Sequence, residues 1–362
     1  MKKRLFLLLL WPIAGLILLL SRCSEEFAEH VFARGIYRVY HTPISFLTGW
    51  MPFSLGELIL YAIIPTILIG LIVWVIHMVR ERTGHVFVRG AVNLLCILGV
   101  VFFMFVFGCG ANYYRYTYAK CTGMEVKPGT DEELYGLCIS LTERANDLRI
   151  QLNDCEDSDG IFVLPFSKRE LALRAKDAVT AFGQENPLLK GYYTPPKPVI
   201  WSEGMSRLEI TGVYFPFTAE ANVNINASDF SIGAAMCHEL SHMAGFMRED
   251  EANYLAWLAC RDSGDPVLDY SGTMLALVYC ARALNNNAPD LYRRVCEAYC
   301  GGVRRDFAAD AAWWQQYDDH PASEFGEKMN DTYLKVNAQN EGTKSYGAMV
   351  DLLLAEYRKN EQ

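Results

Sequence analysis

Residues 231–245 read Ser-Ile-Gly-Ala-Ala-Met-Cys-His-Glu-Leu-Ser-His-Met-Ala-Gly, and this segment carries the strongest signal in the chain. Its small and apolar first half predicts a buried helix, which Gly245 is expected to end. On such a helix His238 and His242 lie one turn apart, so that both imidazoles can bind a single zinc ion. Glu239 between them is placed to act as general base on a zinc-bound water. The segment therefore predicts a catalytic zinc site.

A catalytic zinc site with one open position needs a third protein ligand. In the thermolysin-like enzymes (gluzincins) this ligand is a Glu on a second helix, and a polar residue four positions later holds one ligand histidine from behind. The segment Glu249-Asp250-Glu251-Ala252-Asn253 resembles that pattern, and also the Glu-x-x-Ala-Asp stretch of membrane peptidases related to the CAAX prenyl protease. We therefore expect Glu249 as the third ligand, Asn253 as the residue behind the histidine, and Glu251 as the alternative carboxylate.

Some features of the motif do not fit a standard family. The interval from His242 to Glu249 is shorter than gluzincins usually show. The metzincin pattern His-Glu-x-x-His-x-x-Gly extends to Gly245, but Arg248 stands where that family has its third histidine, so the metzincin interpretation is excluded. Two alternatives stay open: the histidines could pack in a core without metal, or zinc could bind at a site that has lost catalysis.

The first 111 residues predict a membrane anchor with three spans, at about 5–20, 58–79 and 91–107. The first span follows Lys2-Lys3-Arg4 as in a signal peptide, but no small-residue cleavage site follows it, so we expect it to be retained. The basic residues before this span and in the loop between the other two place both segments in the cytoplasm. Residues after about 112 then lie outside it. The aromatic 21–57 loop is expected to contact lipid at the membrane interface.

The remaining residues, 112–362, predict one domain. Residues 1–111 carry nine Lys and Arg and five Asp and Glu, a net charge of +4, whereas the rest carries 24 and 37, a net charge of −13. An acidic external domain argues against nucleic acid as a partner. Most of the cysteines are expected to pack as small buried residues, although a disulfide between Cys121 and Cys138 or between Cys138 and Cys155 is left open.

The hydrophobic pattern of this domain predicts a mainly helical, α+β fold, and the resemblance of its motif to zinc peptidases implies a zincin-like one. Helices are expected at about 131–152, 167–181, 274–284, 291–299, 306–317, 326–336 and 346–357, and strands at 199–201, 208–215 and 221–226. The last strand alternates small or apolar residues with Asn222 and Asn224, which predicts exposure. Zincin folds place such an edge strand above the metal, where its backbone pairs with an extended substrate, and the Asn222/Asn224 alternation fits that role; a plain surface strand is the open alternative.

Several segments together resemble an uncharacterised bacterial family, the domain of unknown function 3810. The resemblance is carried by the stretches 112–115, 215–224, 238–246, 249–253, 330–335 and 345–347. It implies a membrane-anchored protein with the features of a zinc peptidase and brings no established substrate.

The sequence thus predicts a membrane-anchored, Zn²⁺-dependent metallopeptidase that hydrolyses a protein or peptide of the bacterial envelope at the extracytoplasmic face. A donor for the developing oxyanion is also needed, and the candidates are Tyr346, Tyr333 and His320. Two other functions stay open: a zinc-binding envelope protein without catalysis, and an amide hydrolase acting on a cell-wall component.

Overall fold

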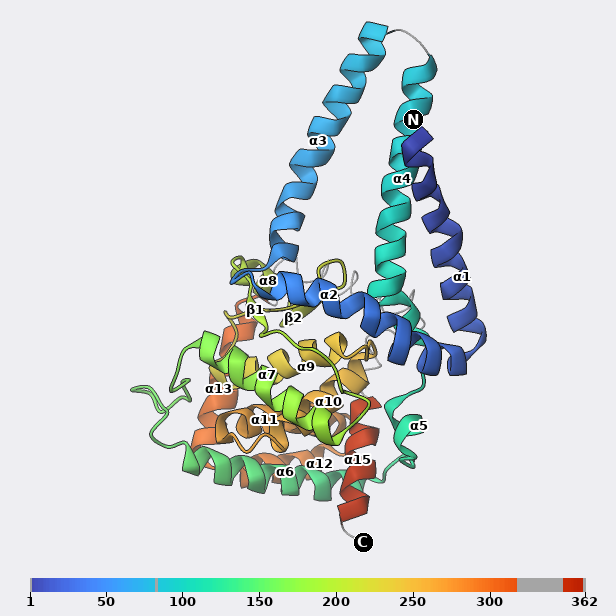
Figure 1. Ribbon diagram of the computed structural model, residues 1–362. Helices are drawn as coiled ribbons and strands as arrows, with labels where there is room; N and C mark the ends of the chain where they lie inside the picture. Colours follow the sequence, from blue (N-terminus) through green and yellow to red (C-terminus); the bar gives the residue numbers. More distant parts are fainter. Residues whose placement is uncertain (1, 82–83, 318–347, 361–362) are drawn as a thin grey trace. The chain divides into compact units, whose positions relative to one another are not determined.

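The computed structural model describes residues 2–81, 84–317 and 348–360, which form two compact units (Figure 1). Unit 1 comprises Met1–Arg115 together with the short loop Phe215–Glu220. Unit 2 comprises Tyr116–Tyr214 and Ala221–Gln362. The loop in unit 1 is therefore far in sequence from the rest of that unit.

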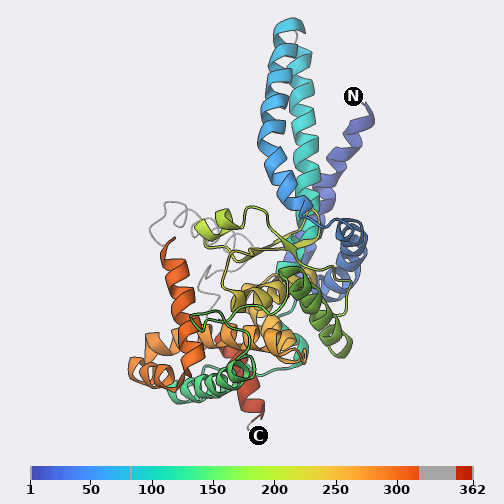
Figure 2. The same ribbon diagram turned by 90° about the vertical axis from the view of Figure 1, so that its left-hand side faces the viewer.

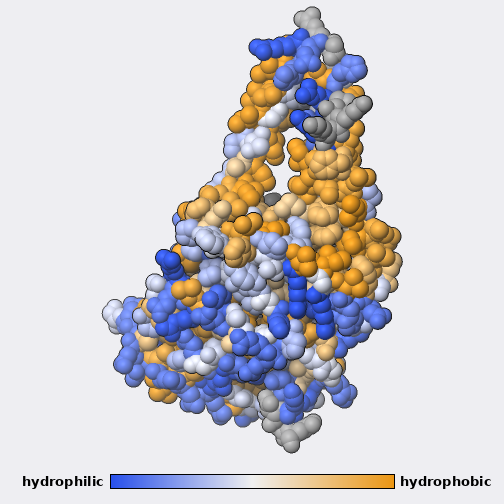
Figure 3. Space-filling model, in the orientation of Figure 1, coloured by the Kyte–Doolittle hydropathy of each residue, from blue (hydrophilic) through white to orange (hydrophobic). Residues whose placement is uncertain are grey.

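Unit 1 is helical. Its elements are η1 (Lys2–Leu9), α1 (Leu10–Cys23), η2 (Phe27–Ile36), α2 (Tyr37–Gly49), α3 (Leu55–Glu81), α4 (Gly84–Gly108) and η3 (Gly110–Tyr114). Three of its helical segments are long and apolar enough to cross a membrane: Arg4–Cys23, Leu55–Glu81 and Gly84–Gly108. They contain the three expected spans, and hydrophobic residues cover the surface of the long helices (Figure 3).

Within unit 1, α1 packs along α4. The Trp11 ring stacks on Phe102 with 5.2 Å between centroids, and its Nε1–H donates to the Leu95 carbonyl at 3.0 Å. The 21–57 segment, expected as a loop, is largely helical, and α2 runs across the direction of the long helices (Figure 1). A buried ion pair joins η2 to the end of the unit, because Arg115 Nε lies 2.8 Å from Glu29 Oε2.

The loop Phe215–Glu220 is fastened at the start of α3. The buried Glu220 carboxylate accepts hydrogen bonds from the backbone N–H of Gly56 at 2.8 Å and of Leu55 at 3.2 Å. A carboxylate at this position satisfies amides that have no partner inside the helix and interacts favourably with the helix dipole. Thr48 Oγ1 also donates to the Thr218 carbonyl at 3.0 Å.

Unit 2 is mainly helical with a small sheet. Its helices are α5 (Tyr118–Thr122), α6 (Asp131–Gln151), α7 (Lys168–Glu185), α8 (Ser202–Arg207), α9 (Asp229–Met243), α10 (Glu249–Arg261), α11 (Pro266–Asn287), α12 (Pro289–Ala298), α13 (Gly301–Gln315) and α15 (Ala348–Asn360). Its strands are β1 (Lys197–Pro198), β2 (Gly212–Phe215) and β3 (Glu220–Val223). β2 ends, and β3 begins, in the loop that belongs to unit 1.

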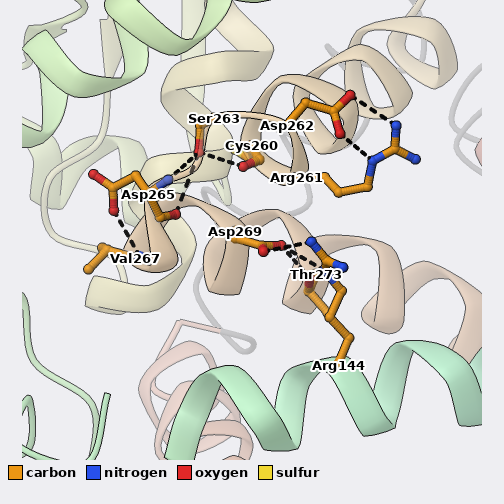
Figure 4. Close-up of polar contacts among 9 residues, drawn as sticks. All are labelled: Arg144, Cys260, Arg261, Asp262, Ser263, Asp265, Val267, Asp269 and Thr273. Atoms are coloured by element: carbon orange, nitrogen blue, oxygen red, sulfur yellow. Dashed lines mark hydrogen bonds and ion pairs between the residues drawn. The ribbon is translucent and has the colours of Figure 1, made fainter. Parts of the chain in front are cut away.

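The core of unit 2 lies where α9, α10 and α11 pack on one another, with α6 against α11 and α7 against α9. Polar contacts fix the corner between α10 and α11 (Figure 4). Asp265 caps α11 by accepting from the Val267 amide at 2.9 Å. Arg144 of α6 donates two hydrogen bonds, of 2.9 and 2.7 Å, to the Asp269 carboxylate. These contacts hold α11 in place behind the two helices that carry the motif residues.

The sheet has the strand order β1-β3-β2, and β1 runs parallel to β3 with Lys197 opposite Asn222. The expectation that 221–226 forms an exposed edge strand is wrong, because β3 is the central strand and all four of its residues are buried. The Asn side chains serve internal hydrogen bonds instead of solvent. Asn222 Nδ2 donates to the Val213 carbonyl at 3.2 Å, and Asn224 Nδ2 donates to the Ile210 carbonyl at 3.0 Å.

Most of the expected helices are confirmed. α6 opens with the capping box of Thr130 and Glu133, and α7 opens with Ser167, whose hydroxyl accepts from the Glu170 amide at 3.2 Å. The helices expected near 274–284, 291–299, 306–317 and 346–357 correspond to α11, α12, α13 and α15, whereas 326–336 lies outside the described residues.

The strand predictions are less accurate. Residues 199–201 were expected as a strand, but β1 ends at Pro198 and Trp201 is the N-cap of α8, a helix that the sequence pattern did not indicate. Of the strand expected over 208–215, only Gly212–Phe215 is extended. All eleven cysteines lie in the described part of the chain and all are free thiols, so neither candidate disulfide is present.

We expect Asp306 to be the most sensitive charged residue of the unit 2 core. Its fully buried carboxylate accepts from Arg149 Nε at 2.9 Å, Tyr270 Oη at 2.6 Å and the Phe162 amide at 2.8 Å. Asp306→Asn removes the fully buried counter-ion of Arg149 and leaves it only the partly exposed Glu156 carboxylate at 3.1 Å, so the free energy of unfolding should fall by up to about 3–5 kcal/mol. Denaturant unfolding of the purified chain measures this.

The matched control is Asp290→Asn, which removes an exposed carboxylate from a surface pair with Arg293. It should change the free energy of unfolding by less than about 0.5 kcal/mol. Equal effects of the two substitutions would contradict the role given to Asp306.

Candidate metal centre

A sharp reversal of the chain between α9 and α10 builds the centre. α9 ends at Met243, and Gly245 follows in the left-handed region with φ +89°. Glycine is favoured there because a side chain would be strained at this backbone conformation. The Gly245 amide donates to the His242 carbonyl at 2.9 Å, and α10 then begins at Glu249. The last turn of α9 and the first turn of α10 are thereby brought next to each other.

Both histidines are held through Nδ1, and their other nitrogens face one carboxylate. His238 Nδ1 lies 2.8 Å from Asn253 Oδ1, and His242 Nδ1 lies 2.7 Å from the Phe246 carbonyl. With each Nδ1–H assigned as donor to an oxygen, Nε2 is the nitrogen that can act as a ligand, which is how metal-binding histidines are usually oriented. His238 Nε2 lies 3.1 Å from Glu249 Oε2, and His242 Nε2 lies 3.6 Å from Glu249 Oε1.

The structure distinguishes the two acidic candidates. Glu249 supplies one of the three ligand atoms, which all lie within 4.8 Å of one another. Glu251 is buried and used elsewhere, because its Oε1 accepts from the Tyr118 amide at 2.6 Å and lies 3.5 Å from Arg248. The short interval after His242 is thus sufficient, since the turn at Gly245 brings the first residue of α10 back over the end of α9.

The spacing of these atoms fits a metal ion. Zinc binds imidazole nitrogen and carboxylate oxygen at about 2.0–2.2 Å, so neighbouring ligands around one tetrahedral ion lie about 3.3 Å apart. The separations between the histidine Nε2 atoms and the Glu249 carboxylate oxygens, 3.1 and 3.6 Å, bracket that value. The residues His238, His242 and Glu249 can therefore hold one metal ion, and among the described residues these three ligands leave a fourth coordination position open.

The pKa values of these three residues also fit a metal-binding cluster. Burial lowers the pKa of His238, but the hydrogen bond and charge of Glu249 outweigh it and raise the pKa to about 9. Burial dominates at His242 and lowers its pKa to about 4. For Glu249 burial acts upward, yet the charges of the two histidines bring its pKa below the usual value. A negative carboxylate thus faces two imidazoles, and a metal ion would take the place of the His238 proton.

Glu239, the expected general base, lies on the buried side of α9 with 3% of its surface exposed. Burial raises the pKa of this carboxyl to about 8, and the opposing charge of His238 only partly offsets it. The carboxylate accepts a hydrogen bond from the backbone N–H of Tyr214 in β2. The sheet lies close to α9 (Figures 1 and 2), and Gly212 of β2 approaches the candidate base so closely that an added Cβ would lie 2.3 Å from Glu239 Oε1.

The other expected site residues are placed as follows. Asn253 contacts His238 as expected, whereas Asn222 and Asn224 bond within the sheet, as described above. His320, Tyr333 and Tyr346, the expected oxyanion donors, lie outside the described residues. Each therefore stays a prediction.

Sequence analysis missed three contributors. These are the Phe246 carbonyl, the β2 backbone at Gly212 and Tyr214, and Tyr279 of α11, whose Oη accepts from Asn253 Nδ2 at 3.3 Å. Only Gly245 gave a usable signal, because a glycine after a helix predicts the turn that returns the Phe246 carbonyl to His242. Tyr279 and Gly212 are distant in sequence, and nothing in the local pattern marks them.

Metal content should separate the two carboxylates. After loading with zinc, Glu249→Gln should retain far less metal than the parent chain because it weakens a ligand, and so should His238→Ala and His242→Ala. Glu251→Gln keeps an acceptor for the Tyr118 amide and should retain zinc. Asn253→Ala should weaken zinc affinity by about 10–100-fold, because the His238 ring loses its support. Zinc per chain after dialysis, measured by mass spectrometry, checks this, and equal losses for the two Gln variants would contradict the assignment.

A protein-family model matches most of the chain. Residues 32–354 match the model of a family described as "Protein of unknown function (DUF3810)". No curated protein and no solved structure matches the chain. The matched region extends from η2 in unit 1 to α15 in unit 2 and includes the whole candidate metal centre. The chain therefore belongs to the DUF3810 family.

Proposed function

We propose that this protein is a membrane-anchored, zinc-dependent metallopeptidase that cleaves a protein or peptide at the extracytoplasmic face of the membrane. The observation that carries the proposal is the convergence of His238 Nε2, His242 Nε2 and Glu249 on one point, with Glu239 following the first ligand on the same helix. Two imidazoles and one carboxylate with an open position are the ligand set of a catalytic rather than a structural zinc site.

Zinc is the metal that best fits these ligands. The set is small, mixes nitrogen with oxygen and includes no thiolate, since Cys237 on the same helix is buried and is not among the three ligand groups. Sites for Mg²⁺ or Ca²⁺ rely on six or more oxygen ligands, whereas imidazole pairs suit zinc. When bound, the metal supplies a Lewis acid and a water of lowered pKa.

The chain's own groups supply the rest of the chemistry. Glu239 accepts the proton of the attacking water and later delivers it to the leaving amine. Asn253 and the Phe246 carbonyl keep the two imidazoles oriented. The low exposure of the ligand side chains, 14% and 9% for the histidines and 16% for Glu249, limits the access of bulk water.

An extended peptide is the substrate class that β2 favours. Alternate residues of a strand direct their backbone groups to opposite sides. The Thr211 carbonyl accepts from the Asn224 amide at 2.9 Å, so Thr211 and Val213 face β3. Gly212 and Tyr214 then face the outer edge, and Gly212 offers one N–H and one C=O to a peptide lying alongside.

Loss of the base tests the reaction. Glu239→Gln keeps the size of the side chain but cannot accept the proton, so turnover of dye-quenched casein by the full chain should fall by about 10²–10⁴-fold. Zinc content should stay near that of the wild type. Glu203→Gln, which removes an exposed carboxylate of α8, is the control and should leave turnover unchanged.

Two outcomes would contradict the peptidase proposal. If Glu239→Gln strips the zinc or unfolds the protein while the parent shows no turnover, Glu239 is a structural group and a zinc-binding envelope protein becomes the better explanation. Turnover of peptidoglycan fragments but not of casein would instead favour a cell-wall amide hydrolase.

The extracytoplasmic location is tested separately. Lys2, Lys3 and Arg4 stand at the start of the first candidate span, and Arg80 and Arg89 lie near the adjoining ends of the other two. The positive-inside rule therefore places the N-terminus in the cytoplasm. Three crossings then place Gln362 outside. Alkaline phosphatase fused after Gln362 should be active and a fluorescent protein there should be dark; the reverse result would contradict this topology.

A further inference from the structure

We propose that Gly212 and the main-chain amide of Tyr214 are positioning groups that set the place of the Glu239 carboxylate. The inference rests on the proposed function, because it concerns the base of the proposed reaction. It extends that function by assigning a role to β2, a strand that supplies none of the three ligand atoms.

The first observation is how closely β2 approaches Glu239. A Cβ atom built on Gly212 would lie 2.3 Å from Glu239 Oε1, 2.7 Å from Cγ and 2.8 Å from Cδ. Such contacts are far shorter than any real Cβ makes, so the Glu239 side chain occupies space that only a glycine leaves open. The end of a glutamate side chain is flexible, and a methyl group at residue 212 would therefore displace the carboxylate rather than the backbone.

The second observation is the hydrogen-bonding state of the carboxylate. It accepts from the Tyr214 amide, and in the described part of the chain Oε2 is buried with no hydrogen-bond partner. The amide thus fixes one oxygen and leaves the other available. A buried acceptor without a partner costs stability, typically about 1–3 kcal/mol, and such groups recur at catalytic sites. An oxygen left in this state fits a group that must accept a proton from water.

These observations complement each other. Gly212 and Tyr214 are two residues apart, so their Cβ positions lie on the same face of β2 and their main-chain groups point to the same edge. The missing side chain at Gly212 lets the carboxylate lie against the strand, and the amide at Tyr214 then orients it. A misplacement of about 1 Å at a reacting group costs about 10²-fold in rate. We accordingly expect the β2 backbone to be as important for the rate as a side chain that contacts the substrate.

The test is Gly212→Ala in the full-length chain, with Val213→Ala as the control. Val213 is adjacent in β2 and its side chain is 40% exposed, so its truncation should be tolerated. With dye-quenched casein as the probe, Gly212→Ala should lower kcat by about 10²-fold, leave KM within about twofold and leave zinc content at the wild-type level. Val213→Ala should change none of the three. A general weakening of the fold would instead lower zinc content or raise KM together with the fall in kcat.

A double-mutant cycle measured by Tm tests whether Gly212 packs on Glu239, and it needs no activity measurement. Gly212→Ala should lower the Tm of the parent, whereas in a Glu239→Ala background, where the side chain that clashes has been removed, it should not. Equal Tm changes in the two backgrounds would overturn the inference, as would an unchanged kcat in Gly212→Ala. If the parent cleaves no casein at all, the proposed function and the catalytic part of this inference fail together, and the Tm cycle then shows separately whether Gly212 packs on Glu239.

Discussion

The turn at Gly245 is the constraint on which the candidate metal centre depends. With φ +89° at this residue the chain reverses immediately after α9, and three consequences follow within a few residues. The Phe246 carbonyl returns to His242 Nδ1, Glu249 becomes the first residue of α10, and its carboxylate faces both imidazoles. The centre is therefore local in sequence, and the rest of unit 2 serves mainly to keep α9 and α10 at a fixed angle, with α7 and α11 packed against them.

The burial of charged groups in this centre lowers the stability of the folded protein. Two carboxylates, Glu239 and Glu249, and two imidazoles are gathered where little of any side chain is exposed. Apolar side chains of similar size would usually be at least as stabilising as a buried ionic cluster. The pKa values of Glu239 and His238 are raised and that of His242 is lowered, so the pKa values within the cluster are spread over a wider range than usual. Such a separation is typical of sites that bind ions or transfer protons rather than of packing clusters.

Local patterns made most of the helices and the ligand set predictable. The spacing of His238 and His242, the cap at Ser167 and the glycine at Gly245 each act over a few residues, and the structure brings the two histidines and Glu249 together as expected. The strands were less predictable. Asn224 and its neighbours look solvated in the sequence, yet their amides bond to carbonyls of residues that lie 9 to 14 positions earlier in the chain. Pairing of that kind depends on tertiary contacts, and so did the contact of Gly212 with Glu239.

β2 starts in unit 2, beside the candidate base, and runs into the loop that belongs to unit 1. β2 begins at Gly212, beside Glu239, and its last residue, Phe215, already belongs to unit 1. The loop that follows is held by Glu220 at the start of α3 and by Thr48 of α2. A short strand with one end free is a poor support for a catalytic group, since strand ends fray unless they are tied down. Removal of residues 1–115 would take away the partners of this loop, and the end of β2 at Phe215 would then lose its support.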